Sequence, residues 1–180
     1  MELFDAIHGR RSIRKFKAQD VPDALIEKLI DAARWAPFSN YLYPPGIVHN
    51  HQPWEFVVVR DSKTKKAFAE PRDEENKFVA DVPVVIVVCV DKSYSMTRWI
   101  EDGFMAIENM LLAVHALGLG AVIMPTFSVR NKIIEDSTRA ALNLPENMQP
   151  VALVCIGYPD EVPEPKKPRE IKEMIHMERW

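Results

Sequence analysis

Four stretches of the chain carry the apolar pattern of buried β-strands, and they cover Trp54–Val59, Val82–Val90, Ala121–Met124 and Val151–Ile156. The second stretch is rich in β-branched residues and has almost no polar position, which predicts a central strand covered on both faces. A shorter segment, Ile13–Phe16, alternates apolar and charged residues, as a half-buried strand does.

Helical periodicity marks two longer segments. The first begins at Asp20–Asp23, with a proline near its first turn, and is expected to end at Pro37. Its buried stripe is predicted to hold Ile26, Leu29, Ile30 and Ala33. The second, Glu101–Leu117, starts with acidic residues, and Gly118 can cap its end. Shorter helical stretches are predicted at Leu3–Ile7, Ser62–Ala69 and Ile171–Ile175, and an exposed loop at Glu70–Lys77.

The interleaved order of these elements favours an α+β fold with a central mixed sheet of about four or five strands flanked by helices. We find no repeat and no long linker, so residues 1–180 are interpreted as a single domain. Residues 159–180 form a proline-punctuated tail that is too polar for the core, yet it carries Met174, Ile175 and Trp180. We expect an extended tail that packs on a partner subunit, and a tail folded back on its own domain is the alternative.

Composition narrows the class of protein. The chain has 180 residues, of which 47% are hydrophobic and 27% charged, as in an ordinary globular domain. A net charge of −3 gives no basic field for nucleic acid. The apolar run Val82–Val90 is too short to span a membrane, and Asp5 interrupts the apolar start, so a cytoplasmic location is expected. Cys89 and Cys155 lie in apolar runs as core residues, and the histidines lack a metal-ligand spacing, so no metal site is predicted.

The strongest chemical signal is the basic segment Arg10-Arg11-Ser12-Ile13-Arg14. A solvated basic face is one interpretation. However, the segment stands between a helix-like stretch and a strand-like stretch, where guanidinium groups are pinned and can grip a phosphate through two hydrogen bonds.

Three further motifs follow in order. The first is Ala36–Asn40 with Asn50–Trp54, the second is Leu117–Phe127, and the third joins Gly157–Pro159 to a basic proline-rich segment and a final Arg-Trp. With Arg10–Arg14, this order over nearly the whole chain resembles the nitroreductase family of flavin enzymes.

That resemblance implies a site for flavin mononucleotide (FMN). The residues that match the family's cofactor contacts are Arg10, Arg11, Ser12, Arg14, Pro37, Phe38, Ser39, Asn50, Gln52, Met124, Pro125, Thr126, Lys167 and Arg169. Asn40 competes with Asn50, because the residues Tyr41–His49 separate two halves that are continuous in the family. A turn-capping role for Asn50 and a structural turn at Met124–Thr126 are open alternatives.

The resemblance also implies chemistry. Arg14, ahead of Lys77, is the candidate to stabilise negative charge on the reduced flavin, and the Thr126 amide is the candidate donor to flavin N5, since Pro125 has no N–H. No protein nucleophile is expected. The family-based hypothesis is a homodimeric oxidoreductase that moves electrons from NAD(P)H to a nitroaromatic or quinone with ping-pong kinetics. A non-catalytic flavin-binding or storage protein, and a module that uses the N-terminal arginines to bind nucleic acid or an acidic partner, are the alternatives.

Overall fold

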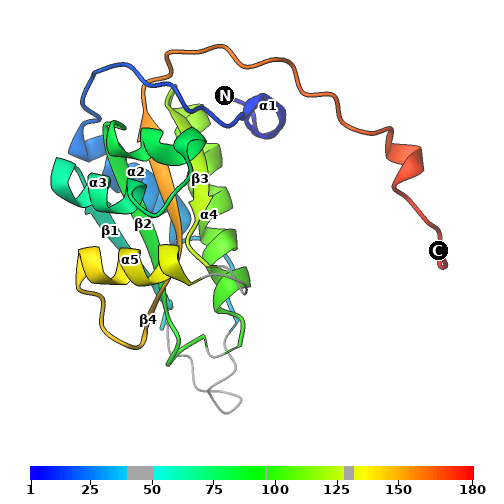
Figure 1. Cartoon of the computed structure of the whole chain (residues 1–180). Helices are drawn as coiled ribbons and strands as arrows, with labels where there is room; N and C mark the ends of the chain where they lie inside the picture. The colour runs from blue at the N-terminus through cyan, green and yellow to red at the C-terminus, as the bar shows by residue number, and fades with distance from the viewer. Residues whose placement is uncertain (40–50, 96, 128–131) are drawn as a thin grey trace.

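The computed structural model describes residues 1–39, 51–95, 97–127 and 132–180, and within them a four-stranded sheet has helices on both faces (Figure 1). The strands run in the order β1-β2-β4-β3. Their bounds are β1 Trp54–Val59, β2 Val84–Asp91, β3 Gly120–Pro125 and β4 Met148–Gly157. Each neighbouring pair is antiparallel. The α+β class and the strand number are thus confirmed. The expectation of a mixed sheet is wrong for these strands, because an apolar pattern does not specify strand direction.

Strand β2 explains why one segment of the sequence lacks polar alternation. All eight of its residues are buried, because both of its faces are covered. Val84, Ile86, Val88 and Val90 pack with α2 and α4, whereas Val85, Val87 and Cys89 pack with α3, η1 and α5. The central strand predicted from the sequence therefore divides two apolar clusters.

The helices that the sequence predicted begin and end close to the expected positions, and one further helix, α5, is present. Their bounds are α1 Leu3–Gly9, α2 Asp23–Ala33, α3 Ser62–Ala69, α4 Trp99–Ala116 and α5 Ile133–Leu142, with 3₁₀ turns η1 Glu74–Ala80 and η2 Ile171–Glu173. Gly118 follows α4 with φ of 74°, a conformation that favours glycine, and so ends the helix as expected. No helix in the described parts of the chain is long and apolar enough to cross a bilayer.

Three local predictions differ from the structure. Helix α5 was not predicted, and η1 occupies part of the segment expected to be a loop. The Ile13–Phe16 segment is not a strand of the sheet, although isolated bridges join Ser12 to Ala121 in parallel and Phe16 to Pro159 in antiparallel orientation. This N-terminal segment therefore contacts the edge of β3 at one point and the start of the tail at another, through two single bridges and not through a continuous strand ladder.

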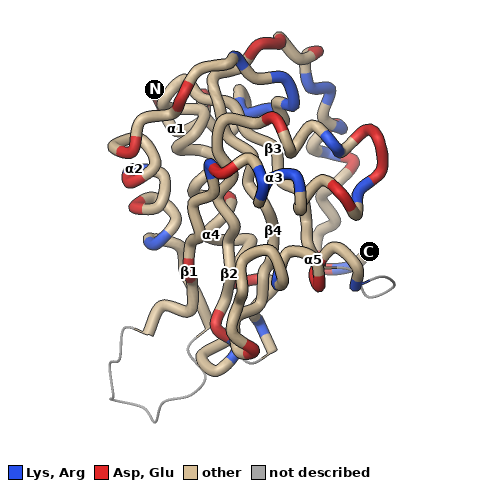
Figure 2. Tube along the Cα trace, turned by 60° about the vertical axis from the view of Figure 1, so that its left-hand side comes forward, with Lys and Arg blue, Asp and Glu red and all other residues tan. Residues whose placement is uncertain are grey.

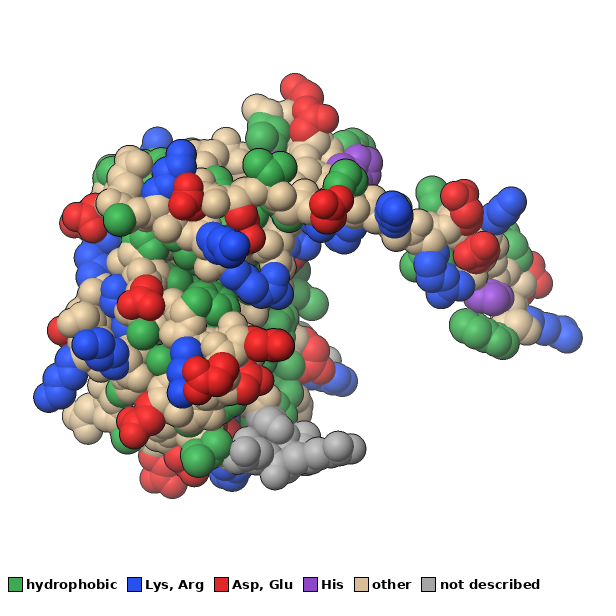
Figure 3. All heavy atoms as spheres, turned by 45° about the horizontal axis from the view of Figure 1, so that its top comes forward, with side chains coloured by type: hydrophobic (Ala, Val, Ile, Leu, Met, Phe, Trp, Pro, Cys, Tyr) green, Lys and Arg blue, Asp and Glu red, His purple; other side chains and the backbone are tan. Residues whose placement is uncertain are grey.

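The tail leaves the body after a short anchored stretch. The Glu161 carboxylate accepts hydrogen bonds from the backbone amides of Arg14 (2.5 Å) and Lys15 (3.0 Å). These bonds, that from Arg14 first, lower the pKa of Glu161. Beyond it the chain extends away from the sheet and its helices (Figures 1 and 3), and Trp180 is fully exposed.

Candidate functional site

The basic segment lies along the outer edge of β3. The amide of Ile13 donates to the carbonyl of Ala121 (2.9 Å), and the Ile13 side chain is 7% exposed. Gly120 makes this approach possible, because a Cβ there would lie 2.8 Å from Cγ1 of Ile13. Successive side chains of an extended segment point to opposite sides. Arg10, Ser12 and Arg14 therefore share one side of the segment.

These three side chains line one hollow. It has a volume of about 230 Å³, and its other walls are Glu108 and Leu111 of α4 and Ala121, Val122 and Ile123 of β3. Arg10 is held there by a loose ion pair, with 3.8 Å between its Nε and Oε1 of Glu108. Two guanidinium groups and a hydroxyl are a donor set that suits a phosphate dianion. The hollow thus fits the phosphate of the flavin that the sequence motif implies.

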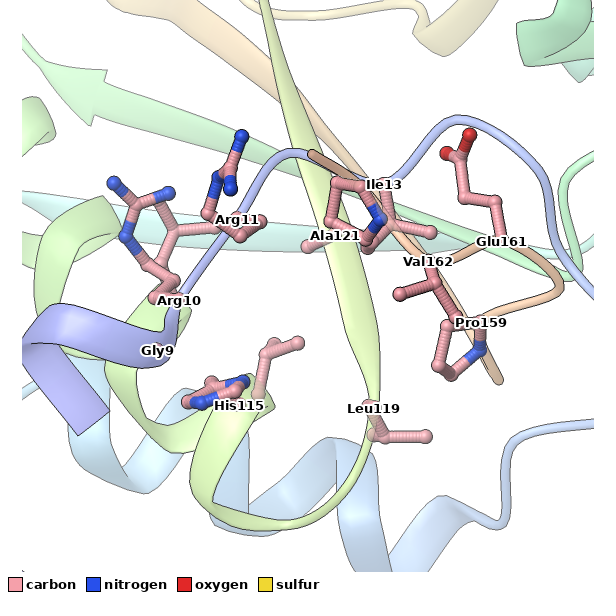
Figure 4. Close-up of a pocket in the computed structure, with 13 residues that line it drawn as sticks. Gly9, Arg10, Arg11, Ile13, His115, Leu119, Ala121, Pro159, Glu161 and Val162 are labelled. Carbon is pink, nitrogen blue, oxygen red and sulfur yellow. The ribbon is translucent and has the colours of Figure 1, made fainter. Parts of the chain in front are cut away.

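Arg11 belongs to a different environment. Its Nη1 donates to the carbonyl of Glu164 at the start of the tail. Arg11 lines a second cavity, of about 180 Å³, between α1, the end of α4 and the tail, and Arg10 reaches both this cavity and the first hollow. Figure 4 shows His115 and Leu119 on one side of this cavity and Val162 across it. The prediction that Arg11 joins Arg10 at the phosphate is therefore not supported by this placement, because Arg11 does not line the hollow that Arg10 shares with Ser12 and Arg14.

The far end of β3 corrects a second prediction. The amide of Thr126 donates to the Val151 carbonyl (3.1 Å), and its hydroxyl donates to the Pro150 carbonyl (2.6 Å). Thr126 is 1% exposed. Its N–H is thus engaged within the sheet and is not free to donate to flavin N5. Met124 is also buried, with its sulfur 3.7 Å from Sγ of Cys155, whereas Pro125 is exposed.

The second motif gathers at the other end of α4. The Phe38 ring packs edge-on against Trp54 (5.5 Å between centroids), and the amide of Ser39 donates to Oδ1 of Asp102 (2.9 Å). Gln52 donates to the carbonyl of Arg34 at the end of α2 (2.8 Å) and so tethers this connection. Pro37 is exposed beside them. Asn40, Asn50 and Tyr41–His49 lie outside the described residues.

The loop and the phosphate hollow lie on different sides of α4. Asp102, beside Ser39, and Glu108, beside Arg10, are about 120° apart around a helix and about 9 Å apart along its axis. One chain therefore does not bring Pro37–Ser39 to the hollow that Arg10, Ser12 and Arg14 line.

The tail cations are also separate from the hollow in one chain. Lys167 and Arg169 are exposed on the segment that leaves the body (Figure 1). Arg169 instead pairs with Glu173, with 3.7 Å between Nε and Oε2. The expected phosphate site that joins these cations to Arg10 is thus not formed within this chain.

The two cysteines, the possible metal ligands and the other charged residues form no second reactive site among the described residues. Burial raises the pKa of Cys89 and Cys155 to about 12, so neither is a nucleophile at neutral pH. Among the described residues, no group of three or more His, Cys, Asp or Glu side chains is placed to hold a metal. Figure 2 shows Lys and Arg interspersed with Asp and Glu along the trace.

Asp102 is the site residue that the sequence reasoning missed. It is a buried carboxylate on the first turn of α4, at 1% exposure. The sequence signal was an acidic residue at a helix start, which is usually exposed. Only the fold reveals its partners.

Comparisons with known proteins agree with the motif order. Residues 7–71 and 69–158 match the sequence profile of the Nitroreductase family. The chain is 34% identical over 182 residues to a Methanothermobacter thermautotrophicus protein provisionally named an NADH dehydrogenase/NAD(P)H nitroreductase, covering 100% of this chain and 88% of that protein. It is 30% identical over 172 residues to the oxygen-insensitive NADPH nitroreductase of Salmonella typhimurium, covering 93% and 69%.

Solved structures share the fold over the whole chain. An FMN-dependent nitroreductase from Clostridium difficile superposes with a TM-score of 0.84 at 26% identity, covering 98% of this chain and 99% of that one. A provisionally named nitroreductase in complex with FMN, from Desulfovibrio desulfuricans, gives a TM-score of 0.80 at 27% identity, covering 100% and 98%.

Proposed function

The chain belongs to the Nitroreductase family, and we propose on that basis that it is an FMN-dependent oxidoreductase that takes electrons from NAD(P)H and passes them to a small electron-poor acceptor such as a nitroaromatic or quinone. The observation that carries the proposal is the placement of Arg10, Ser12 and Arg14 in one hollow beside β3. FMN, when bound, would supply the exchange of a hydride or electrons between the two substrates.

The residues of the hollow would bind the cofactor's phosphate. Arg10 would neutralise part of its charge, and Ser12 would donate a hydrogen bond. The edge strand β3 is about 20 Å long, given its six residues and the usual rise per residue, and Ala121, Val122 and Ile123 in its middle line the hollow. An extended cofactor could lie along the outer edge of this strand.

Arg14 keeps its proposed role near the electron-accepting ring. Its backbone is fixed by Glu161, while its side chain lies in the hollow. A fixed cation beside developing negative charge stabilises that charge without reorganisation. Replacement by leucine should lower the flavin's reduction potential while FMN remains bound. An unchanged potential in a fully loaded Arg14→Leu protein would exclude this role.

A second copy of the chain would complete the site. The tail residues Met174, Ile175 and Trp180 are 59%, 55% and 100% exposed, and Phe4 of α1 is 68% exposed. Apolar surface of this kind is usually covered by a partner. In a homodimer, the tail cations of one copy would reach the phosphate hollow of the other, and its Pro37–Ser39 loop would meet the ring of the same flavin.

Mixed dimers test this arrangement. One chain would carry Arg10→Ala and the other Phe38→Ala, with different tags, and bound FMN would be counted in the purified mixed dimer. If each site takes Arg10 from one chain and Phe38 from the other, the mixed dimer keeps one intact site and recovers half the flavin. Sites built within single chains would each carry a defect, and no recovery would be seen.

The catalytic proposal is tested on the purified holoprotein. We expect a yellow protein that releases FMN on denaturation, bleaches anaerobically with NADH or NADPH, and regains its colour with a quinone or nitroaromatic. Initial rates at several concentrations of both substrates should give the parallel lines of ping-pong kinetics. Bound flavin that neither nucleotide reduces would favour a flavin-storage protein instead, and purified protein that binds no flavin would refute both.

A further inference from the structure

Asp102 joins four parts of the chain at the start of α4. Its Oδ1 accepts from the amide of Ser39 (2.9 Å), and its Oδ2 accepts from the hydroxyl of Ser95. Its backbone carbonyl accepts from Nε1 of Trp54 (2.9 Å), and its own amide donates to the carbonyl of Arg98 (2.9 Å). Asp102 therefore links the loop after α2, the start of β1, the turn after β2 and the first turn of α4.

Its burial makes these bonds consequential. Asp102 is 1% exposed and Ser95 is 2% exposed, so neither side chain can replace a lost partner with bulk water. No ion pair to Asp102 is found in the described ranges of the chain. The carboxylate is instead satisfied by an amide, a hydroxyl and the positive end of a helix. Each of its oxygens thus fixes one donor in place.

We propose that Asp102 is a positioning residue that holds the Pro37–Ser39 loop in the conformation that contacts the flavin ring. The inference rests on the proposed function, because the flavin is the loop's ligand there. Two contacts fix the loop where it leaves α2: the Ser39 amide on Asp102, and the Phe38 ring on Trp54. Trp54 is itself bound to the backbone carbonyl of Asp102, so the two contacts meet at this residue, and the Asp102 side chain supplies the contact to Ser39.

Two substitutions of Asp102 distinguish a role in positioning the loop from a role in stabilising the fold alone. Asp102→Ala removes both acceptors, whereas Asp102→Asn keeps an oxygen for the Ser39 amide and gives Ser95 an N–H. Glu135→Ala is a matched control. Glu135 is also a buried acid, 5% exposed, in the first turn of a helix, but its ion-pair partner is Arg139 and it does not contact the loop.

The readout is the dissociation constant of FMN and of riboflavin, measured by competition on the holoprotein. Riboflavin has the same ring without the phosphate. We expect Asp102→Ala to weaken both ligands by the same factor, tenfold or more, and Asp102→Asn to stay within threefold of the parent. Glu135→Ala should lower the unfolding temperature and leave both constants unchanged.

Several results would overturn the proposal. One is a folded Asp102→Ala protein with parental constants, and another is an Asp102→Asn protein as weak as Asp102→Ala. If Asp102→Ala does not fold, Ser95→Ala is the second variant, because it removes only the donor to Oδ2. It should raise the dissociation constants of FMN and of riboflavin by factors similar to each other. Parental constants in Ser95→Ala would then count against the proposal. Failure of the proposed function is distinguishable, since the unaltered protein would bind no flavin.

Discussion

Replacing Arg10, and separately Arg11, tests whether the hollow lined by Arg10, Ser12 and Arg14 binds the phosphate of FMN. In Arg10→Ala, the hollow loses a charge-assisted hydrogen bond to phosphate, which contributes about 1.5–3 kcal/mol. That range corresponds to a roughly 10- to 150-fold rise in the dissociation constant of FMN. The cost to folding should be small, because the ion pair with Glu108 is loose at 3.8 Å and Glu108 is 54% exposed.

Arg11→Ala is the matched control. Arg11 has the same charge and length, but its guanidinium donates to the Glu164 carbonyl and it does not line the hollow that Arg10 shares with Ser12 and Arg14. We expect its FMN dissociation constant to stay within about twofold of the parent. The assay is flavin fluorescence after release from holoprotein, with riboflavin in parallel, because riboflavin should not respond to Arg10→Ala.

The result that refutes the reasoning is equal weakening of FMN by the two substitutions. Equal loss would mean that the alternation of side chains along this segment does not decide which arginine binds phosphate. Equal weakening of FMN and riboflavin by Arg10→Ala would place Arg10 at the ring rather than at the phosphate.

Three further outcomes follow from individual contacts. Gly120→Ala should lower the free energy of unfolding by about 1–3 kcal/mol in a denaturant titration, since its Cβ would lie 2.8 Å from Ile13; an unchanged midpoint would contradict this close packing. The lowered pKa of Glu161 contributes to the free energy of unfolding above the ordinary glutamate pKa, and this contribution is lost as pH falls through the lowered value. Glu161→Gln should therefore flatten the acidic part of a plot of unfolding free energy against pH. An unchanged acidic part would show that the hydrogen bond from the Arg14 amide is not formed. Deletion from Pro163 onward should abolish dimerisation and FMN binding together, as read by light scattering and absorbance; a flavin-loaded dimer without the tail would contradict the two-chain site.

The sequence predicted most of the sheet because its strands are runs of apolar residues, as buried strands must be. The bounds of β1 match the prediction, and those of β2 and β4 differ from it by one to three residues. Helix α5 was missed although it is amphipathic: its fully buried residues are the polar Glu135 and Thr138, whereas its apolar Ala141 and Leu142 are only partly buried against the core. A polar residue that is buried through a hydrogen bond or an ion pair gives no signal in a hydrophobic pattern.

The site was predicted at the level of segments but not of atoms. The sequence marked Arg10–Arg14, yet it could not separate Arg10 from Arg11, because that depends on a bridge to Ala121, more than a hundred residues away. The Thr126 amide was assigned to the flavin, but the parity of β3 turns it toward Val151. Asp102 gave no distinctive signal, since its donors come from segments far from it in sequence or across a turn.

The alternating direction of the backbone groups along β3 also shows which of them lie on its outer edge. Since Thr126 points inward to β4 and the Ala121 carbonyl points outward to Ile13, Ile123 and Pro125 also have their backbone polar groups on the outer edge. In the described residues, the bridge at Ala121 is what pairs this edge. An unpaired edge needs a cover. Because Pro125 has no N–H, the Ile123 amide is the outward donor that β3 has beyond the bridge, and we expect it, rather than Thr126, to meet whatever polar edge is bound there.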